Sequence, residues 1–353
     1  MSRMQGWRVG AALLAVAAAG CQYVQPHRAA RQRYAAGKLA MERGEYDAAL
    51  AELARAVERD RTFASAYAAI GDIQRKRGNF VQAARAYEQA CENNPYDFRP
   101  HYNLGVTYQL LAEAARTAEN AAEWISKAAN VYLRAVATKP GDFEALLNLS
   151  VCYFQQGRNE QAEQYCRMAI DVDPDNPYAY SNLGIIYDSQ NRPYDAIKAY
   201  KDSLERDVHQ PRLLLNLGAT YHRLGWTGDA IHAYKLAAQE DPMLAAAYEQ
   251  MGACYVARRQ WTEAVDAFKK AAQLDESSAV AYRGLGVVFM ARYLIDSNDS
   301  ALRDSALEAW RRSLALDPRQ PELQQLIDKY GVPKRERSRL GSPLRPEAVV
   351  EPL

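Results

Sequence analysis

An excess of charge of either sign is absent from this chain of 353 residues, in which 44 Lys and Arg stand against 43 Asp and Glu. A nucleic-acid partner or an acidic substrate selects for a basic surface, so this balance argues against both. The five histidines are scattered without the spacing of metal ligands, and phosphate-binding loops, dinucleotide turns and nucleophile elbows do not occur. We expect a protein that is not an enzyme and that has no metal site, cofactor or small-molecule substrate.

Long apolar runs are missing except near the N-terminus, where residues 9–20 are all small or apolar. A helix of that length rises about 18 Å, which is short of the ~30 Å hydrocarbon core of a membrane. Arg3 and Arg8 precede the run, and Cys21 follows it directly after Ala-Ala-Gly. A basic start, a short apolar run and small residues before a cleavage point are typical of an export signal.

The position of Cys21 resembles the lipobox of bacterial lipoproteins, in which this cysteine is lipidated and becomes the new N-terminus. The resemblance implies a lipoprotein signal peptide over residues 1–20 and a lipidated tether over residues 21–29. With Gln22 after the cysteine, it also implies a lipid-anchored protein of the Gram-negative outer membrane that faces the periplasm. Several acyl chains are needed for such an anchor, since one chain binds only marginally. Two alternatives stay open: a conventional signal peptide, which leaves a secreted or periplasmic protein, or an N-terminal anchor.

Phenylalanine is rare, with 7 residues, whereas tyrosine reaches 23, so tyrosine must occupy a recurring structural position. A pattern does recur beyond residue 30, with a period of about 34 residues, and its clearest copy is "AYAAIGDIQRKRGNFVQAARAYEQACENNP". This copy places an aromatic residue, a glycine, an alanine, a second aromatic residue and a proline in order, namely Tyr67, Gly71, Ala83, Tyr87 and Pro95. The copies begin near residues 30, 64, 98, 143, 177, 211, 245 and 279.

The pattern resembles the tetratricopeptide repeat, a helix–turn–helix unit. The resemblance implies an all-α fold, a right-handed α-solenoid of about eight repeats over residues 30–320, with longer copies at 98–142 and 279–320. Small residues at the glycine and alanine positions would let the two helices of a repeat pack closely, and proline would end the second helix. A capping helix is expected over residues 321–330, and the proline-rich tail at 331–353 is expected to be disordered.

The longer copies carry two inserts. The first, around residues 112–123, is rich in Ala and Glu and predicts lengthened helices, and the second, around 296–304, predicts a turn followed by a helix. Each insert is either a binding protrusion or a tolerated variation in length. Cys152 and Cys166 occupy positions that are buried in this repeat, where they are either free thiols or, in an oxidising compartment, a disulfide.

An amide side chain recurs two residues before the small residue of the first helix, in five successive copies: Asn103, Asn148, Asn182, Asn216 and Gln250. The row resembles the asparagine ladder of the O-GlcNAc transferase repeat superhelix, which implies that it binds extended peptide backbone in a concave groove. A carboxamide both donates and accepts, so it pairs with peptide C=O and N–H groups regardless of side chain. At ~1 kcal/mol each, four asparagines give about 4 kcal/mol, near millimolar affinity. The alternative is that the amides only bond neighbouring helices.

Mostly apolar residues border this amide row, namely Tyr102, Leu147, Phe154, Ile185 and Leu215. Amides beside apolar side chains suit an extended protein segment, so we predict that these residues also bind peptide. The expected function is that of a non-enzymatic, membrane-anchored adaptor whose groove binds extended segments of periplasmic or envelope proteins. The alternative is a structural or assembly subunit of an envelope machine (a pilus, secretion or cell-wall complex) that acts through its convex face and inserts.

Overall fold

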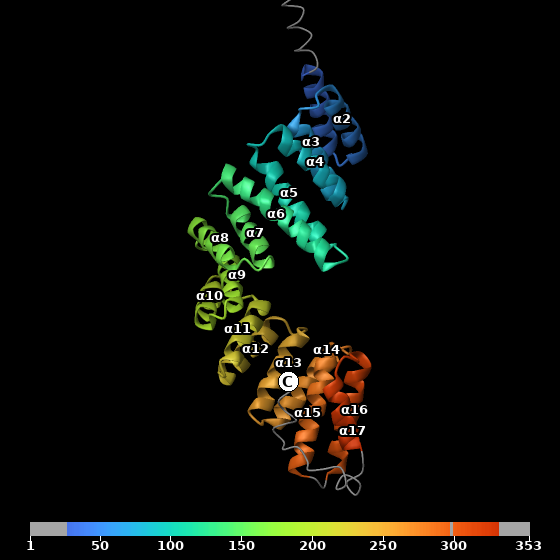
Figure 1. Cartoon of the computed structure of the whole chain (residues 1–353), viewed down its shortest axis with the longest axis vertical. Coiled ribbons are helices and arrows are strands. Elements are labelled where there is room, and N and C mark those ends of the chain that lie inside the picture. Colours follow the sequence, from blue (N-terminus) through green and yellow to red (C-terminus); the bar gives the residue numbers. More distant parts are fainter. Residues whose placement is uncertain (1–26, 297–298, 332–353) are drawn as a thin grey trace, which may run out of the picture. The chain divides into compact units, whose positions relative to one another are not determined.

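The computed structural model describes residues 27–296 and 299–331, and within these ranges it contains helices and no strand. The predicted signal peptide, Cys21, most of the predicted tether and the tail from residue 332 lie outside the described residues. A helical stretch over residues 27–42 comes first. The other helices follow in order (Figure 1): α2 (Tyr46–Arg59), α3 (Ala64–Lys76), α4 (Phe80–Asn93), α5 (Phe98–Glu113), α6 (Ala118–Thr138), α7 (Phe143–Gln155), α8 (Asn159–Val172), α9 (Pro177–Ser189), α10 (Pro193–Arg206), α11 (Pro211–Arg223), α12 (Thr227–Glu240), α13 (Ala245–Ala257), α14 (Trp261–Leu274), α15 (Ala279–Ile295), α16 (Ser300–Leu316) and α17 (Pro321–Gly331).

Successive helices pack as helix–turn–helix hairpins. Residues 27–42 pair with α2, then α3 pairs with α4, and so on until α15 pairs with α16, which gives eight hairpins in the described part of the chain. We call the first helix of each hairpin helix A and the second helix B. The predicted all-α solenoid is confirmed.

The hairpins divide into two compact units, Met1–Pro174 and Asp175–Leu353, which we call the N-terminal unit and the C-terminal unit. Helices α2 to α8 lie in the first and α9 to α17 in the second. The sequence pattern predicts one continuous solenoid over residues 30–320, because the repeat passes Pro174 without any change. The division into two units is therefore visible in the structure and not in the sequence.

The turn between helix A and helix B depends on one residue in the left-handed backbone conformation. Gly78 in the α3–α4 turn has φ +76°, and glycine occupies the same position in three other hairpins. Asn191 and Arg259 adopt this conformation at the equivalent position, with φ of +57° and +56°. Glycine is preferred here because a Cβ atom strains this conformation, although asparagine tolerates it better than most residues.

Helix A and helix B approach closely because a glycine of helix A faces a large side chain of helix B. A Cβ atom added to Gly71 would lie 2.6 Å from Cε1 of Tyr87, and one added to Gly105 would lie 2.6 Å from Cε1 of Tyr132. The interior is too densely packed for such an atom. The same contact joins Gly184 to Tyr200, Gly218 to Tyr234, Gly252 to Phe268 and Gly286 to Trp310. These rings are buried, so the predicted role of the glycines is confirmed.

The two long copies place their extra residues in helices. α5 and α6 have 16 and 21 residues, and α15 and α16 have 17 each, whereas α7 and α8 have 13 and 14. The lengthened part of α6 carries Trp124, whose ring stacks on Tyr108 with 5.5 Å between the centroids. The insert is thus packed against its own hairpin.

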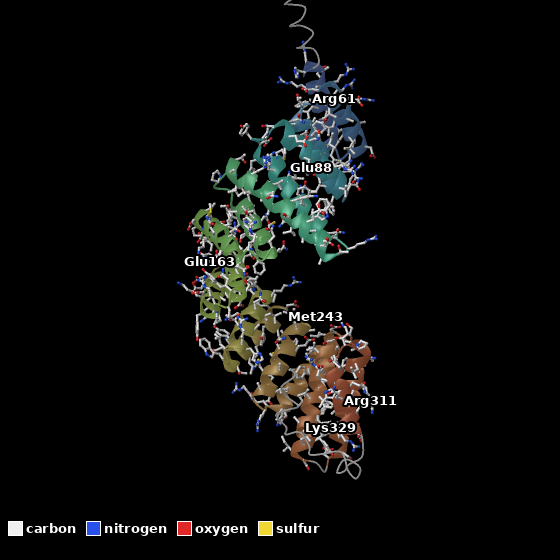
Figure 2. The ribbon with its side chains drawn as sticks, viewed as in Figure 1. Arg61, Glu88, Glu163, Met243, Arg311 and Lys329 are labelled. Carbon is white, nitrogen blue, oxygen red and sulfur yellow. The ribbon has the colours of Figure 1, made fainter. Side chains whose placement is uncertain are left out.

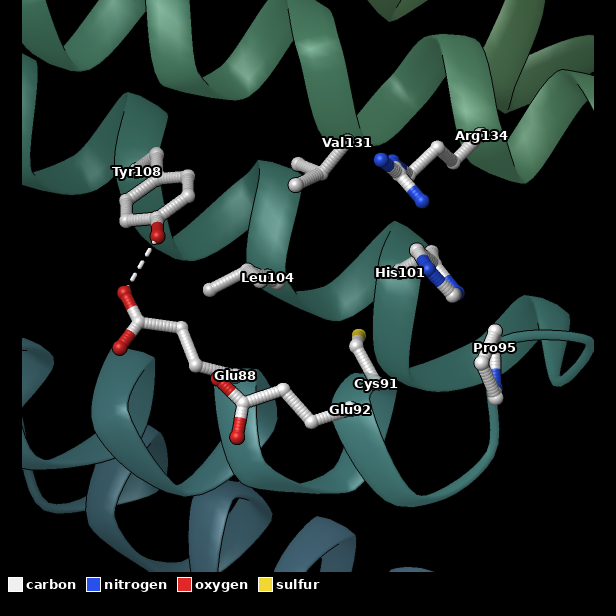
Figure 3. A pocket seen from close by; sticks show the side chains of 9 residues that line it. All are labelled: Glu88, Cys91, Glu92, Pro95, His101, Leu104, Tyr108, Val131 and Arg134. Atoms are coloured by element: carbon white, nitrogen blue, oxygen red, sulfur yellow. Dashed lines mark hydrogen bonds between the residues drawn. The ribbon is translucent and has the colours of Figure 1, made fainter.

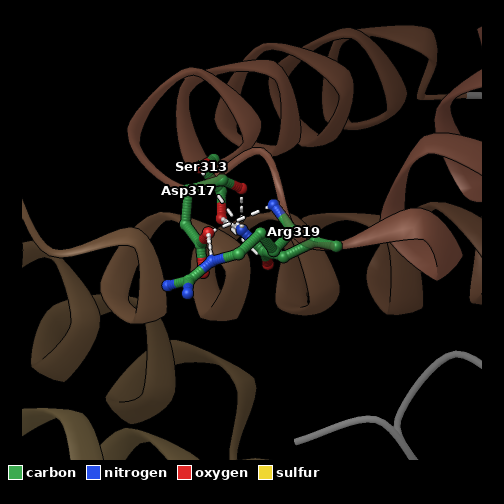
Figure 4. Close-up of polar contacts among 4 residues, drawn as sticks. Ser313, Asp317 and Arg319 are labelled. Atoms are coloured by element: carbon green, nitrogen blue, oxygen red, sulfur yellow. Dashed lines mark hydrogen bonds and ion pairs between the residues drawn. The ribbon is translucent and has the colours of Figure 1, made fainter.

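The connection from α16 to α17 uses side-chain hydrogen bonds at the end of helix B (Figure 4). Ser313 Oγ donates to the carbonyl oxygen of Ala279 at 2.8 Å, and Gln320 Nε2 donates to the carbonyl oxygen of Asp317 at 2.9 Å. Arg319 Nε pairs with Asp317 Oδ1 at 3.1 Å. Ser203 and Gln210 make the equivalent bonds before α11, where the usual proline is replaced by Val208. The same bonds thus form in the turn that contains Pro318 and in the turn where Val208 replaces the proline.

Helix α17 covers the last hairpin. Leu323, Ile327 and Tyr330 are buried in one apolar core with residues of α15 and α16, among them Trp310. An outer helix that buries the face of the last repeat is what a solenoid end requires.

Candidate functional site

The predicted amide row lies on the A helices and falls into two groups. Asn103 on α5 and Asn148 on α7 belong to the N-terminal unit, whereas Asn182 on α9, Asn216 on α11 and Gln250 on α13 belong to the C-terminal unit. The asparagines are half-buried and Gln250 is exposed. The residue after each of them is buried in its hairpin, so the amides lie at the border between core and solvent.

In the N-terminal unit, Asn103 is held by the preceding hairpin. Its Nδ2 donates to Asp72 Oδ1 on α3 at 3.1 Å, and the same carboxylate oxygen accepts from Tyr87 Oη at 2.6 Å. The hydrogen bond therefore joins two neighbouring A helices. For Asn103 this supports the alternative role that the sequence left open, a bond between helices.

Asn148 lies near the phenol of Tyr102 on α5 and acts on its pKa. Burial raises the pKa of Tyr102 above its ordinary value, Glu144 and Asp142 add to the rise, and Asn148 opposes it. The structure thus brings together two residues that the sequence placed in the binding surface. Leu147 and Phe154, predicted beside them, are half-buried on α7, where they leave part of their apolar surface open.

In the C-terminal unit, the amides do not bond neighbouring helices. The side chains of Asn182, Asn216 and Gln250 make no hydrogen bond to any described residue. The helices that carry them, α9, α11 and α13, contact one another in that order. Ile185 and Leu215, predicted as apolar neighbours, are half-buried on α9 and α11. The described structure therefore presents three amides with free donors and acceptors beside apolar side chains.

A different residue, Asp188, joins α9 to α11. Its Oδ2 accepts from Tyr200 Oη at 3.0 Å and from Thr220 Oγ1 at 2.6 Å, and its Oδ1 pairs with Arg223 Nη2 at 2.5 Å. Burial raises the pKa of Tyr200, and the Asp188 carboxylate raises it further. Because Asp188 bonds the helices, the amides of Asn182 and Asn216 are not needed for that purpose.

Asp188 belongs to a pattern that the sequence prediction missed. The residue four positions after the small residue of helix A is polar in the hairpins whose large helix B side chain is tyrosine. The hairpins of Tyr87, Tyr132, Tyr200 and Tyr234 have Arg75, Gln109, Asp188 and His222 at this position, whereas those of Leu53, Cys166, Phe268 and Trp310 have Met41, Phe154, Val256 and Met290. Tyr132 Oη donates to Gln109 Oε1 at 2.6 Å, and Arg75 Nε donates to Tyr87 Oη at 3.4 Å. Aligning the repeats and comparing these two positions would have revealed it.

The cysteines of the described residues are free thiols, so Cys152 and Cys166 are not bonded to each other. Both are buried, and burial raises the pKa of each thiol to about 12. A thiol that stays protonated behaves as a small apolar side chain. These cysteines fill the core and offer no nucleophile.

Two further searches of the described residues gave no site. No group of three or more His, Cys, Asp or Glu side chains in residues 27–296 and 299–331 is placed to hold a metal ion. Among the described helices, none is both long enough and apolar enough to span a bilayer.

These observations define the class of protein. Repeated helical hairpins, all but the α7–α8 hairpin with a glycine of helix A packed against a large side chain of helix B, form an α-solenoid that displays amides and apolar side chains from its A helices. Family models of the tetratricopeptide repeat match residues 34–98, 142–207 and 181–245. The chain therefore contains tetratricopeptide repeats, and it is a scaffold for protein–protein interaction.

Solved structures with this fold resemble the chain. A tetratricopeptide repeat protein from Parabacteroides merdae has a TM-score of 0.54 and 16% identity over 76% of this chain and 99% of its own. The Cut9–Hcn1 hetero-tetramer of the APC/C has a TM-score of 0.52 and 16% identity over 80% of this chain and 52% of its own. Pseudomonas aeruginosa pilF follows with a TM-score of 0.49 and 22% identity over 64% and 96%. No curated protein matches in sequence.

Proposed function

We propose that this chain is a non-enzymatic, membrane-anchored adaptor that binds extended segments of periplasmic or envelope proteins along the A helices of its C-terminal unit. The observation that carries the proposal is the set of three successive amides, Asn182, Asn216 and Gln250, that are free of internal hydrogen bonds. A carboxamide can donate to a peptide C=O and accept from a peptide N–H at once, so it recognises backbone rather than sequence.

The apolar residues beside the amides contribute the binding free energy that the amides alone do not provide. Three hydrogen bonds at about 1 kcal/mol each give about 3 kcal/mol, which is weaker than millimolar affinity. Ile185 and Leu215 keep part of their apolar surface open beside Asn182 and Asn216. Burying such surface contributes about 25 cal/mol per Å², so the amides orient the segment and the apolar contacts hold it.

The proposal narrows the predicted binding surface. Asn103 is bonded to Asp72, and Asn148 lies near the phenol of Tyr102, so a ligand must compete with these contacts before it uses either amide. We therefore assign peptide binding first to Asn182, Asn216 and Gln250.

Membrane attachment is the second part of the proposal, and it rests on the sequence around Cys21. The basic start, the short apolar run and the Ala-Ala-Gly before Cys21 support lipidation and an outer-membrane, periplasm-facing location. The test is Cys21→Ser followed by fractionation of cells. We expect the variant to leave the membrane fraction, and a variant that stays there contradicts the lipid anchor.

Partner capture tests the binding surface. A triple variant, Asn182→Ala, Asn216→Ala and Gln250→Ala, removes three bonds, so we expect affinity for the captured protein to fall at least tenfold and at most about a hundredfold. The readout is an affinity pull-down from membranes with mass spectrometry, followed by titration of the partner that is found. Thermal unfolding should be unchanged, because these side chains hold no neighbour.

The matched control replaces amides on the B helices. Gln239 on α12 and Gln273 on α14 are exposed, so Gln239→Ala with Gln273→Ala changes the same chemistry on the other helix of the hairpin. Unchanged capture by the triple variant, with capture lost in this control, would overturn the proposal. That result would favour the alternative, a subunit of an envelope machine that binds through the B helices and the inserts.

A further inference from the structure

Two aromatic side chains of the C-terminal unit lie on the surface and contact each other across two hairpins. Tyr194, in the first turn of α10, is 66% exposed, and Trp226, which directly precedes α12, is 43% exposed. Their ring centroids lie 6.0 Å apart, with 61° between the ring planes. We call these two residues the aromatic pair. Neighbouring aromatic rings that are exposed to solvent are typical of an interaction surface.

The fold accounts for only one ring of the aromatic pair. The residue four positions before the small residue of helix B covers a tyrosine of helix A, as Arg192 does over Tyr187 at 4.2 Å. Trp226 does the same for Tyr221, with 5.9 Å between the stacked rings. Tyr194 has no such role. The equivalent position of other hairpins holds Asp47, Val81, Glu160, Gly228 and Thr262. The hairpin therefore does not require an aromatic ring at Tyr194.

The equivalent tryptophan of the N-terminal unit differs from Trp226. Trp124 stacks on Tyr108, whose Oη donates to Glu88 Oε1 at 2.5 Å beside a cleft of about 330 Å³ (Figure 3). Nζ of Lys127 lies over the ring of Trp124, 4.3 Å from its centroid. Trp124 is thus half-buried and already covered by a side chain of its own helix. Trp226 instead shares an exposed surface with a ring of the neighbouring hairpin.

The tail that follows α17 leaves the C-terminal unit at the edge where the aromatic pair lies. α17 begins as α11 does: Gln320 and Gln210 each donate to the carbonyl oxygen three residues earlier, and each is followed by a proline that starts the helix. In this register Gly331, the last residue of α17, corresponds to Tyr221. Lys329, labelled in Figure 2, lies in the same last turn. The chain therefore continues from the edge that the A–B turns form.

The tail is long enough to reach the aromatic pair. Three steps from one helix A to the next separate α17 from α11, and packed helices lie about 8–10 Å apart, which gives about 30 Å. An extended chain spans at most about 3.3 Å per residue, so residues 332–343 span up to about 40 Å. Both ends of this path belong to the C-terminal unit.

The sequence of the tail has the chemistry that exposed aromatic rings bind. It contains Pro-Leu-Arg-Pro at residues 343–346. In the polyproline conformation three residues complete one turn, so the rings of Pro343 and Pro346 lie on one face, about 9 Å apart. Proline-rich segments in this conformation dock on aromatic side chains. A segment that has too few apolar residues to fold alone can still become ordered on binding.

We infer that the aromatic pair binds the chain's own tail, with residues 343–346 lying across the two rings in the polyproline conformation. The two proline rings pack on the aromatic pair, and Arg345 pairs with the carboxylate of Asp229. Asp229 is exposed in the first turn of α12 and makes no hydrogen bond or ion pair to another described residue. Because the tail is joined to the same unit, its effective concentration at the pair is high and weak contacts hold it. A proline-rich segment of another protein lacks this advantage.

A photo-crosslinker at the position of Tyr194 tests the inference on the full chain. p-Benzoylphenylalanine keeps an aromatic ring there and, on irradiation, bonds to nearby C–H groups. Light (unlabelled) and heavy (isotope-labelled) copies are mixed before irradiation, and mass spectrometry maps the products. We expect crosslinks to residues 343–346 in which both ends are light or both are heavy. A crosslink between a light and a heavy chain assigns the surface to the tail of a second copy, and that result overturns the inference. Crosslinks in membranes only to another protein, or none to the tail, also overturn it.

Matched variants locate the contact. Tyr178 is 61% exposed in the first turn of α9, at the opposite edge of the unit, so a crosslinker there should not reach the tail. Pro343→Ala with Pro346→Ala should lower the yield from the Tyr194 position at least about fivefold, because both ring contacts are lost. Pro352→Ala keeps residues 343–346 and should leave the yield unchanged. These proline variants leave the described helices unchanged in sequence, so parent-like yield in the double variant contradicts the inference.

Discussion

At the scale of single residues, most hairpins of this solenoid bury a large side chain of helix B, and the surroundings of that side chain are of two kinds. A large side chain of helix B is buried against helix A, and where it is tyrosine, its hydroxyl needs a hydrogen bond. Tyr132 Oη donates to Gln109 and Tyr200 Oη donates to Asp188, whereas the hairpins of Phe268 and Trp310 have apolar residues at the corresponding position. A tyrosine ring therefore occurs with a polar residue on helix A, and a phenylalanine or tryptophan ring occurs with an apolar one.

Tyr234 is the exception among these tyrosines. Its Oη is buried and makes no hydrogen bond to a described residue, although His222 stands at the corresponding position of helix A. We predict that Tyr234→Phe leaves the free energy of unfolding unchanged or raises it by up to about 1 kcal/mol, because the variant removes a buried hydroxyl without a partner. Chemical denaturation monitored by circular dichroism measures the change.

Tyr132→Phe is the control for that substitution. It removes the same atom from a ring that is equally buried, but this hydroxyl has a partner in Gln109. We expect a loss of about 1–2 kcal/mol, because the Gln109 acceptor is left unpaired. Equal effects of the two substitutions would show that the hydrogen bond of Tyr132 does not stabilise the fold.

At the scale of helices, the distance between helix A and helix B is set by the glycine. A Cβ atom on Gly218 would lie 2.5 Å from Cε1 of Tyr234, and that ring is fully buried. We predict that Gly218→Ala lowers the free energy of unfolding by about 1–3 kcal/mol, the usual cost of an overpacked core, despite the better helix propensity of alanine. Denaturant titration of the full chain measures it.

Gly228 provides the control in the same hairpin. It lies in the first turn of α12, and a Cβ atom added there would have no neighbour within 4 Å. Gly228→Ala should therefore raise stability by about 0.5–1 kcal/mol, through helix propensity alone. A stabilising effect of both substitutions would mean that the two helices can move apart without cost.

Most of the helical architecture could be predicted from the sequence, because it depends on residues that recur at fixed spacing. A pair such as Gly71 and Tyr87 identifies the hairpin that contains it, and the same spacing recurs in most of the other copies. The candidate site was harder, since an amide looks the same in the sequence whether Asp72 holds it, as at Asn103, or nothing does, as at Asn182.

At the scale of the whole molecule, the two compact units differ in the state of their amides. In the N-terminal unit, Asn103 is bonded to Asp72 and Asn148 lies near the phenol of Tyr102. The C-terminal unit holds the three amides that are free. Hairpins of a solenoid interact mainly with their neighbours, so each unit keeps most of its own contacts when it is separated from the other.

This division predicts where partner capture resides. A fragment of residues 175–353, which contains Asn182, Asn216 and Gln250, should capture the same partners as the full chain, whereas a fragment of residues 1–174 should not. Circular dichroism establishes first that each fragment is helical, and the pull-down from membranes then compares them. The triple alanine variant of the fragment 175–353 is the control, and it should lose capture as the full chain does. A folded fragment 175–353 that captures nothing would show that the free amides are insufficient for binding, because every residue assigned to the interaction is present in it.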